Sequence, residues 1–468
     1  MEKYLYLLKN IGFLTVSNIS TKLLMFLLVP LYTSILSTAD YGKYDFIQTT
    51  VNILVPILTI NIYESVMRYA MDRSYSLSEV FSVGVHYCII GNLLIILFLF
   101  VNNLFVLNVF IKEFSLYFFL FFFVNSFLGV ISATARGLGE FKSVAISGVI
   151  GSSVSISMNI LCLCVFKWGI DGYFIANIIG ILSQMIYLTI AIHCWKYLSL
   201  KIHDFQTKTE MLGYSIPTIA NAISWWINDL ADRYILIFLC DISVNGIYSV
   251  AAKIPAILNM LQSIFSQAFM LSAVKEFDAD DKKGFFRKTF TLYNFTLVLL
   301  CSLIICFDKI LAHFLYANEF FTAWKYAPFL TISIIFGSLS GYAGSIFATI
   351  KRSDYFVRCS GTGAIANILM NFIFIPRIGA LGAAIATTFS YWIVYLVSVY
   401  YLHKTMNVKL ASIKDNIAYI ILFFQSILLL VEYNSYFVEY IMQFTIFTFL
   451  IVLYFKEIKC IIKRKEIS

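Results

Sequence analysis

An apolar stretch near the middle of the chain, residues 213–255, contains many polar and charged side chains. The apolar run at 212–238 predicts a helix. At about 100° per residue, one edge of this helix carries polar and aromatic groups along its full height. These are Asn221, Ser224, Trp225, Asn228 and Asp232, with Asp229 and Arg233 farther round. The pattern fits polar contacts between packed helices, but a stripe of this length favours the wall of a water-filled cavity.

Similar residues occur in two other apolar segments, spans 1 and 2 of the chain, and in span 8, which begins within the same stretch. Span 1 places an amide and a lysine on one face, span 2 places a carboxylate and an arginine four residues apart, and span 8 has a lysine two residues before a proline. In span 2, Pro56 predicts a kink. These residues are Asn18, Lys22, Glu64, Arg68 and Lys253.

Composition predicts the environment of these groups. The chain has 468 residues, of which 60% are hydrophobic and 13% charged, whereas a soluble protein carries about 25% charged residues. Runs of about 20 apolar residues, enough for a helix to cross a bilayer, recur from end to end. We therefore predict an all-α polytopic membrane protein with about 14 transmembrane helices. The expected spans are 11–35, 44–67, 80–100, 114–135, 143–166, 170–194, 212–238, 244–271, 289–308, 326–350, 355–375, 379–402, 414–431 and 436–455.

The distribution of basic residues predicts the orientation. With both termini in the cytoplasm, 25 of the 34 lysines and arginines fall in inside segments and 6 in outside segments, as the positive-inside rule expects. Only Lys22, Arg233 and Lys253 remain inside spans. The net charge of +8 is thus explained by loops at the inner leaflet, and no nucleic-acid partner is expected.

No cofactor or metal site is expected. None of the nine cysteines forms a Cys-x-x-Cys pair, and no histidine lies at matching spacing. All loops are short, so no soluble domain is inserted between spans. Any chemistry must take place in the membrane or at its surface.

An internal repeat predicts the architecture. Five short motifs recur in the same order at offsets of 203 to 215 residues; for example, Gly169-Ile-Asp-Gly172 returns as Gly379-Ala-Leu-Gly382. Six spans separate the copies, so both halves have the same orientation, as in transporters built from parallel repeats. We expect an N-terminal lobe at 1–200, a C-terminal lobe at 201–405, and an extra helix pair with a basic cytoplasmic tail at 406–468.

The chain resembles the polysaccharide-export branch of the multidrug/oligosaccharidyl-lipid/polysaccharide exporter superfamily, and most of all the O-antigen (Wzx-type) flippases. The resemblance covers nearly the whole chain. Its carriers are Tyr214-Ser-Ile-Pro217, Asp232-Arg233-Tyr-Ile-Leu, Asn245-Gly246-Ile-Tyr248-Ser-Val-Ala-Ala-Lys253 and Asn367-Ile-Leu-Met-Asn371-Phe-Ile-Phe-Ile-Pro376-Arg-Ile-Gly379-Ala-Leu-Gly382.

The resemblance implies two six-helix lobes around a central cavity in a bacterial inner membrane. It also implies that an undecaprenyl-diphosphate-linked oligosaccharide moves from the inner to the outer leaflet in O-antigen or lipopolysaccharide biosynthesis. Such a path needs cations for the diphosphate, and we expect Lys22, Arg68, Arg233 and Lys253 to supply them. The expected substrate-binding set is completed by Asn18, Asn221, Trp225 and Asn228.

Three carboxylates have two interpretations. Glu64, Asp229 and Asp232 either pair with Arg68 and Arg233 or bind a coupling proton or sodium ion. The expected partners are membrane lipids, the lipid-linked oligosaccharide and the polysaccharide polymerase machinery, with the chain acting as a monomer.

Other function classes remain as alternatives. A multidrug/cation antiporter and a peptidoglycan-precursor flippase would have the same superfamily fold. A sugar-lipid polymerase or ligase would also be polytopic, but such an enzyme needs a long extracytoplasmic loop for its catalytic groups. Because the outer loops here are short, an enzyme is not expected.

Overall fold

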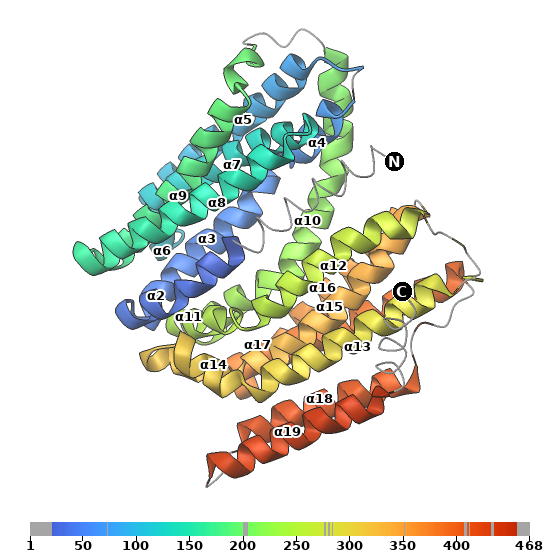
Figure 1. Cartoon of the computed structure of the whole chain (residues 1–468). Coiled ribbons are helices and arrows are strands. Elements are labelled where there is room, and N and C mark those ends of the chain that lie inside the picture. The colour runs from blue at the N-terminus through green and yellow to red at the C-terminus, as the bar shows by residue number, and fades with distance from the viewer. Residues whose placement is uncertain are drawn as a thin grey trace. The chain divides into compact units, whose positions relative to one another are not determined.

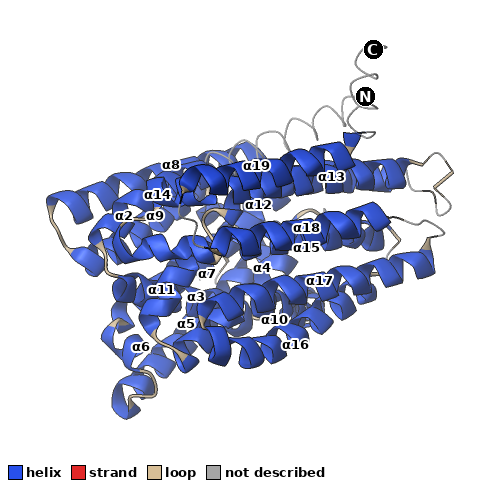
Figure 2. Cartoon of the chain, turned by 90° about the horizontal axis from the view of Figure 1, so that it is seen from below, coloured by secondary structure: helices blue, strands red, loops and turns tan. Residues whose placement is uncertain are grey.

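The described chain is helical throughout. The computed structural model describes residues 21–72, 74–199, 205–275, 278, 281–282, 284–350, 352–406, 410, 412–431 and 435–455. Within these residues only helices and connecting turns or loops occur (Figure 2). The chain divides into two compact units, Met1–Trp226 (unit 1) and Ile227–Ser468 (unit 2). The domain boundaries predicted at 200 and 405 stay a prediction.

The first unit contains a series of apolar helices and the first part of α10 (Figure 1). In order they are α2 (Val29–Ile35), α3 (Thr38–Leu58), α4 (Ile62–Ala70), α5 (Leu77–Phe105), α6 (Val109–Glu113), α7 (Ser115–Gly137), α8 (Phe141–Asn159) with its π-helical extension η1 (Ile160–Val165), α9 (Gly169–Ala191), η2 (Cys194–Lys196) and α10 (Phe205–Leu239).

The second unit begins within α10 and ends with a helix pair. Its helices are α11 (Ile242–Ala251), α12 (Pro255–Lys275), α13 (Phe285–Cys306), α14 (Asp308–Leu315), η3 (Asn318–Lys325), α15 (Ala327–Thr349), α16 (Ser353–Ile378), α17 (Ala380–Thr405), α18 (Ile413–Leu430) and α19 (Tyr436–Leu453). The last two lie side by side (Figure 1).

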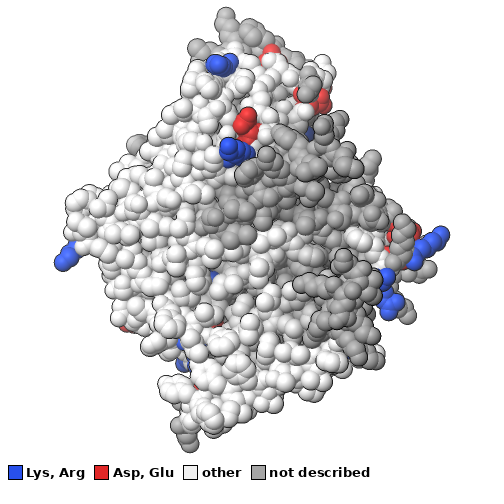
Figure 3. All heavy atoms as spheres, viewed as in Figure 1, with Lys and Arg blue, Asp and Glu red and all other residues white. Residues whose placement is uncertain are grey.

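The predicted membrane class is confirmed. Ten helices of the described residues are long and apolar enough to cross a membrane, or twelve if α3 with α4 and α11 with α12 each count as one bent span. The other two predicted spans correspond to α10, a helix of 35 residues, and to the apolar helix Thr21–Ile35. On the face drawn in Figure 3, few charged side chains of the described residues reach the surface, and broad areas between them carry none.

The repeat is present in the fold as well as in the sequence. In unit 1, α7 packs on α4, α5 and α9, and α8 packs on α9; in unit 2, α15 packs on α12, α13 and α17, and α16 packs on α17. The turns between the paired helices also correspond, since Gly169 and Gly379 both have positive φ, 57° and 59°. This backbone conformation is one that glycine adopts without steric cost.

Equivalent helices also begin in the same way. The Ser37 side chain accepts the Asp40 amide at the start of α3, and the Asp241 side chain accepts the Ser243 amide at the start of α11. Such caps satisfy amide groups that have no partner in the first turn of a helix. Ser37 and Asp241 are 204 residues apart, an offset that the repeat predicts.

Both second spans of the repeat are broken. The axes of α3 and α4 differ by 60°, and those of α11 and α12 by 49°. The kink predicted at Pro56 is displaced: α3 continues through Pro56 to Leu58, and the break follows at Thr59–Asn61. There Ile60 and Asn61 adopt positive φ. A right-handed helix cannot continue through residues in this left-handed conformation, so the helix ends here and not at Pro56.

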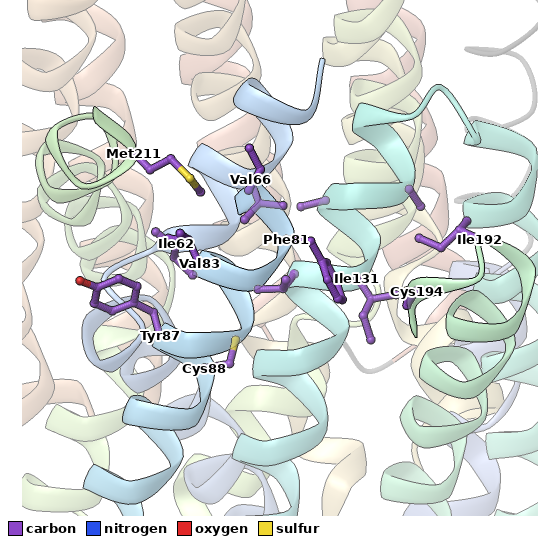
Figure 4. Close-up of a cluster of buried hydrophobic side chains, with 14 of the residues drawn as sticks. Ile62, Val66, Phe81, Val83, Tyr87, Cys88, Ile131, Ile192, Cys194 and Met211 are labelled. Carbon is purple, nitrogen blue, oxygen red and sulfur yellow. The ribbon is translucent and has the colours of Figure 1, made fainter. Parts of the chain in front are cut away.

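The apolar core of unit 1 joins α10 to the preceding helices. Buried Ile62 and Val66 of α4 pack with Phe81 of α5 and Ile131 of α7, and Met211 of α10 belongs to the same cluster. Figure 4 shows Met211 pointing toward the α4 side chains. The start of α10 is thereby fixed to unit 1.

Candidate functional site

The polar edge predicted on α10 is divided between the two units. Asn221, Ser224 and Trp225 precede the boundary after Trp226, and the remaining polar residues of the edge follow it. Asn221 and Trp225 are half-buried. The Asn221 Oδ1 is buried and has no hydrogen-bond partner in the part of the chain that the structure describes. An amide oxygen in this state can accept a hydrogen bond from a ligand.

Asp232 lies in the most complete polar cluster of unit 2. Its side chain is 2% exposed. The Tyr248 hydroxyl of α11 donates a hydrogen bond to Oδ2, and the Thr387 hydroxyl of α17 donates to the same oxygen at 3.1 Å. The Arg233 amide lies 3.0 Å from Oδ1. Three elements thus supply the environment of one buried carboxylate.

Two asparagines of α16 extend this cluster. Asn367 Nδ2 lies 3.5 Å from Thr387 Oγ1 and 3.4 Å from Ser390 Oγ. Asn371 Nδ2 donates to Asn367 Oδ1 at 2.9 Å. Both asparagines are fully buried, and Asn371 Oδ1 has no hydrogen-bond partner among the described residues. The cluster therefore contains a carboxylate and several neutral oxygens, one of them an acceptor without a donor.

Asp229 and Asn228 contact different helices of unit 2. The Tyr391 hydroxyl of α17 donates a hydrogen bond to Asp229 Oδ1, while the Asp229 residue is exposed. Asn228 is buried, and its Nδ2 donates to the Ser360 carbonyl of α16 at 3.0 Å. Asn228 thus makes a polar contact between α10 and α16. Asp229 has a hydrogen-bond partner, although the residue is exposed.

The position of unit 1 that is equivalent to Asp232 carries no carboxylate. At the repeat offset of 212, Asn367 and Asn371 correspond to Ser155 and Asn159, and at 210 Thr387 corresponds to Asn177. At the offset of 203, Asp232 corresponds to Val29, which is buried. The Ser155 hydroxyl is 3.2 Å from Asn177 Oδ1, and Asn159 Nδ2 is 2.8 Å from the Ser155 carbonyl. The position of Asp232 therefore carries a carboxylate in one copy and an apolar side chain in the other, although unit 1 has its own buried carboxylate, Asp45, next to Tyr44, the counterpart of Tyr248.

The three basic residues predicted inside spans have different surroundings. Lys22 is exposed in the first described helical turns, and Arg233 is half-buried on α10. Lys253 is half-buried at the break between α11 and α12, where its amide donates to the Val250 carbonyl at 2.9 Å. Asn18 lies outside the described residues.

Arg68 and Glu64 do not form the pair considered from the sequence. No ion pair within 4.0 Å joins them in the described part of α4; instead, the Arg68 guanidinium lies 5.0 Å from the centre of the Tyr214 ring on α10. Such a cation–π contact leaves the charge available to other groups, since the ring does not neutralise it. Arg68 is exposed and Glu64 is half-buried.

Polar contacts hold α4 against α10 around Arg68. Asn61 Nδ2 donates to Thr218 Oγ1 at 2.8 Å, and the hydroxyls of Ser65 and Ser215 are 2.5 Å apart. Beyond the end of α4, the Tyr75 hydroxyl donates to Glu210 at 2.6 Å, and this carboxylate raises the pKa of Tyr75 to about 12. The tyrosine therefore stays a donor at physiological pH.

The groups of these clusters can donate or accept hydrogen bonds and carry charge. No group of three histidine, cysteine, aspartate or glutamate side chains that could hold a metal is present in the described ranges. The partners Tyr248, Thr387, Asn371 and Tyr391 were not among the predicted site residues. The spacing of Asn367 and Asn371, one helical turn apart in an apolar segment, was the available signal.

Comparisons with known proteins identify the fold. A family model described as polysaccharide biosynthesis protein matches residues 7–274, more than half of the chain. An uncharacterized membrane protein of Methanocaldococcus jannaschii is 26% identical over 117 residues, which are 25% of this chain. That match spans 23% of the relative's own length.

Solved structures match over most of the chain. The lipid II flippase MurJ, in an inward closed conformation, matches with a TM-score of 0.69 and 15% identity, over 97% of this chain and 99% of that chain. An inward-facing multidrug resistance transporter of the MATE family matches with a TM-score of 0.64 and 12% identity, over 83% of this chain and 97% of that chain. The fold is therefore that of MurJ and MATE transporters.

Proposed function

Since the chain belongs to the polysaccharide biosynthesis protein family, we propose that it moves an undecaprenyl-diphosphate-linked oligosaccharide from the inner to the outer leaflet of a bacterial plasma membrane. The transporter fold supports a membrane flippase or transporter. The lipid-linked cargo, of the O-antigen or capsule type, is our proposal. Alternating access would carry it, as in other transporters built from repeats.

The observation that carries this proposal is the retention of cations inside an apolar helical fold. Lys22, Arg233 and Lys253 are the only basic residues that the predicted loops do not explain. A diphosphate cannot cross hydrocarbon without charge compensation, and lysine or arginine provides it through charge-assisted hydrogen bonds. Lys253 lies at a helix break, and such breaks occur at binding sites of transporters.

The Asp232 cluster is our proposed site for a coupling ion, either a proton or sodium. The carboxylate accepts a hydrogen bond from the Thr387 hydroxyl, and Asn367 and Asn371 continue this hydrogen-bonded series on α16. A buried carboxylate in a membrane protein is costly unless a cation or a proton compensates it. The apolar counterpart of Asp232 in unit 1, Val29, supports a special role for this position in unit 2.

A deletion strain tests the proposed cargo. We expect loss of surface polysaccharide and retention of lipid-linked repeat units inside the cell, because the polymer is assembled from units on the outer leaflet. The wild-type gene restores the polymer, whereas Lys22→Ala, Arg233→Ala and Lys253→Ala do not. Lys112→Ala, on the short helix α6, is the matched control and restores it.

Normal polymer from all three variants at normal expression would contradict the cation path. Normal polymer in the deletion strain itself, in the absence of a second transporter, would contradict the proposed cargo. The two failures are therefore distinguishable by the same gel of surface polysaccharide.

A second candidate function is transport of the peptidoglycan precursor. The match to the lipid II flippase over 97% of this chain is the observation that favours it. Complementation of a conditional lipid II flippase mutant separates the candidates. Restored growth supports precursor transport, and continued lysis with restored surface polysaccharide supports the first proposal. A multidrug/cation antiporter would instead lower the toxicity of cationic dyes.

A further inference from the structure

A hollow of about 550 Å³ lies in unit 2 and is lined by residues other than those of the Asp232 cluster. Three elements line it: α14, η3 and the first turn of α19. Its volume is in the range of about 300–1,000 Å³ that is usual for small-molecule sites. The topology predicted from the basic residues places these segments on the outer side of the membrane.

Each element contributes side chains at a spacing that brings them to one face. Lys309 and His313 are four residues apart on α14, as are Tyr436 and Tyr440 on α19, and residues at this spacing share one side of an α-helix. Phe321 and Trp324 are three apart on the 3₁₀ helix η3, where this spacing superimposes side chains. The lining is therefore constructed from paired positions.

The charge in the hollow is compensated from within. Lys309 Nζ lies 2.8 Å from Oε1 of Glu439, whose side chain is 3% exposed. The same ammonium lies 4.5 Å from the centre of the Trp324 ring. An anionic ligand would have to compete with a buried carboxylate for this lysine, whereas an uncharged ligand would leave the pair intact.

The remaining groups suit a sugar. Aromatic rings offer flat faces for the C–H faces of a pyranose, while the tyrosine hydroxyls and the imidazole of His313 can donate or accept hydrogen bonds and the Lys309 ammonium can donate them. Tryptophan and tyrosine also occur singly as anchors at membrane surfaces. Here, however, the rings of Phe321, Trp324, Tyr436 and Tyr440 converge on one hollow together with a polar pair.

We propose that this hollow binds an uncharged saccharide unit. The inference goes beyond the proposed transport, because it concerns binding at one end of a single unit and is measured without transport. Trp324 provides the stacking surface, and Glu439 keeps Lys309 from attracting anions.

Saturation-transfer NMR on the full chain in lipid nanodiscs tests the proposal, with no glycoside detergent present because its headgroup would compete. The probes are methyl glucoside, methyl galactoside, methyl N-acetylglucosaminide, methyl glucuronide and inorganic phosphate. We expect transfer to one or more of the uncharged glycosides and weaker transfer to the two anions. Trp324→Leu and Tyr440→Leu each weaken binding about tenfold, the size of one lost aromatic contact.

Trp392→Leu is the matched control, because this half-exposed tryptophan of α17 lies outside the hollow, and its binding stays at the wild-type value. Glu439→Gln releases Lys309 and raises affinity for methyl glucuronide. The proposal is overturned if the wild type binds none of the uncharged glycosides or prefers an anion. It is also overturned if both aromatic variants bind the glycosides as tightly as the wild type.

Discussion

Asp232 is buried with two hydroxyl donors, whereas Asp229, three residues earlier on the same helix, is exposed with one. The two carboxylates therefore differ in what replaces a lost hydrogen bond. Asp232 is buried, so a lost donor leaves an acceptor without compensation. Around Asp229, which is exposed, water can take the place of the donor.

Tyrosine-to-phenylalanine variants measure this difference. Tyr248→Phe is expected to lower the free energy of unfolding by about 1.5–3 kcal/mol, the usual contribution of a hydrogen bond to a charged group. Tyr391→Phe, which removes the donor to Asp229, is the matched control and is expected to cost less. Chemical denaturation in detergent gives both values, and an equal loss would contradict a wet environment at Asp229.

The role in coupling has its own variant. Asp232→Asn preserves the size of the side chain but removes its charge, so the chain is expected to fold and to lose stimulation of transport by an imposed proton or sodium gradient. Vesicles with each gradient in turn provide the measurement. If the wild type responds to neither gradient, the coupling proposal fails independently of the cargo.

At the scale of elements, close helix packing depends on particular glycines of α16. A Cβ at Gly363 would lie 2.1 Å from Val394 Cγ2 and 2.9 Å from Asn228 Oδ1, whereas a Cβ at Gly361 would meet no atom within 4 Å. The contact of Gly363 joins α16 to both α10 and α17. The two positions are two residues apart on one helix, so they share the same backbone setting.

Alanine substitution at these two glycines separates the effect of steric crowding on stability from the effect of helix propensity. Gly361→Ala is expected to be neutral or to stabilise by up to about 1 kcal/mol, because alanine is the better helix former. Gly363→Ala is expected to destabilise by about 1–3 kcal/mol through overpacking. Thermal unfolding in detergent distinguishes them, and a stabilised Gly363→Ala would show that α16 and α17 are less tightly packed than the structure indicates.

The elements were largely predictable, and their interruptions were not. Apolar runs predicted spans such as 379–402, which the structure gives as Ala380–Thr405, because burial in lipid selects hydrophobic length directly. The break after α3 could not be placed from Pro56. It depends on the left-handed backbone of Ile60 and Asn61 and on the contact of Asn61 with Thr218, which is 157 residues away.

Only part of the candidate site could be predicted, because its residues come from both local and distant positions of the sequence. The polar edge of α10 is local in sequence, so helical periodicity found Asp229 and Asp232. Their partners Tyr391 and Thr387 are about 160 residues away on α17, and a single sequence does not pair distant positions. The supposed pair of Glu64 and Arg68 shows the converse, because correct spacing did not produce an ion pair when Tyr214 offered the arginine another contact.

At the scale of the whole molecule, the C-terminal helix pair is bonded into unit 2. Asp415 of α18 accepts hydrogen bonds from Asn294 of α13 and from Tyr454, each at 2.8 Å. Ser302 of α13 donates to Gln425 at 2.8 Å. These groups are buried, so the pair, which has no counterpart in unit 1, is part of the packed unit.

Truncation tests this integration. Removal of residues 406–468 leaves Asn294 and Ser302 without their partners and is expected to lower the unfolding temperature, since unpaired buried polar groups cost about 1–3 kcal/mol each. Asn294→Leu with Asp415→Leu is a useful comparison, because it removes both partners of one hydrogen bond and leaves the hydroxyls of Tyr419 and Tyr454 without their acceptors. A truncated chain as stable as the full chain would show that α18 and α19 are dispensable for the fold.

The central claim, movement of an undecaprenyl-diphosphate-linked oligosaccharide, is tested most directly with the purified chain in lipid vesicles. The vesicles contain the lipid-linked oligosaccharide with a fluorescent label on its sugar, and an impermeant reductant bleaches label on the outer leaflet only. We predict that vesicles with the wild-type chain lose label from both leaflets, whereas vesicles with Arg233→Ala or without protein lose only the outer label. Equal bleaching in wild-type and protein-free vesicles would contradict the account.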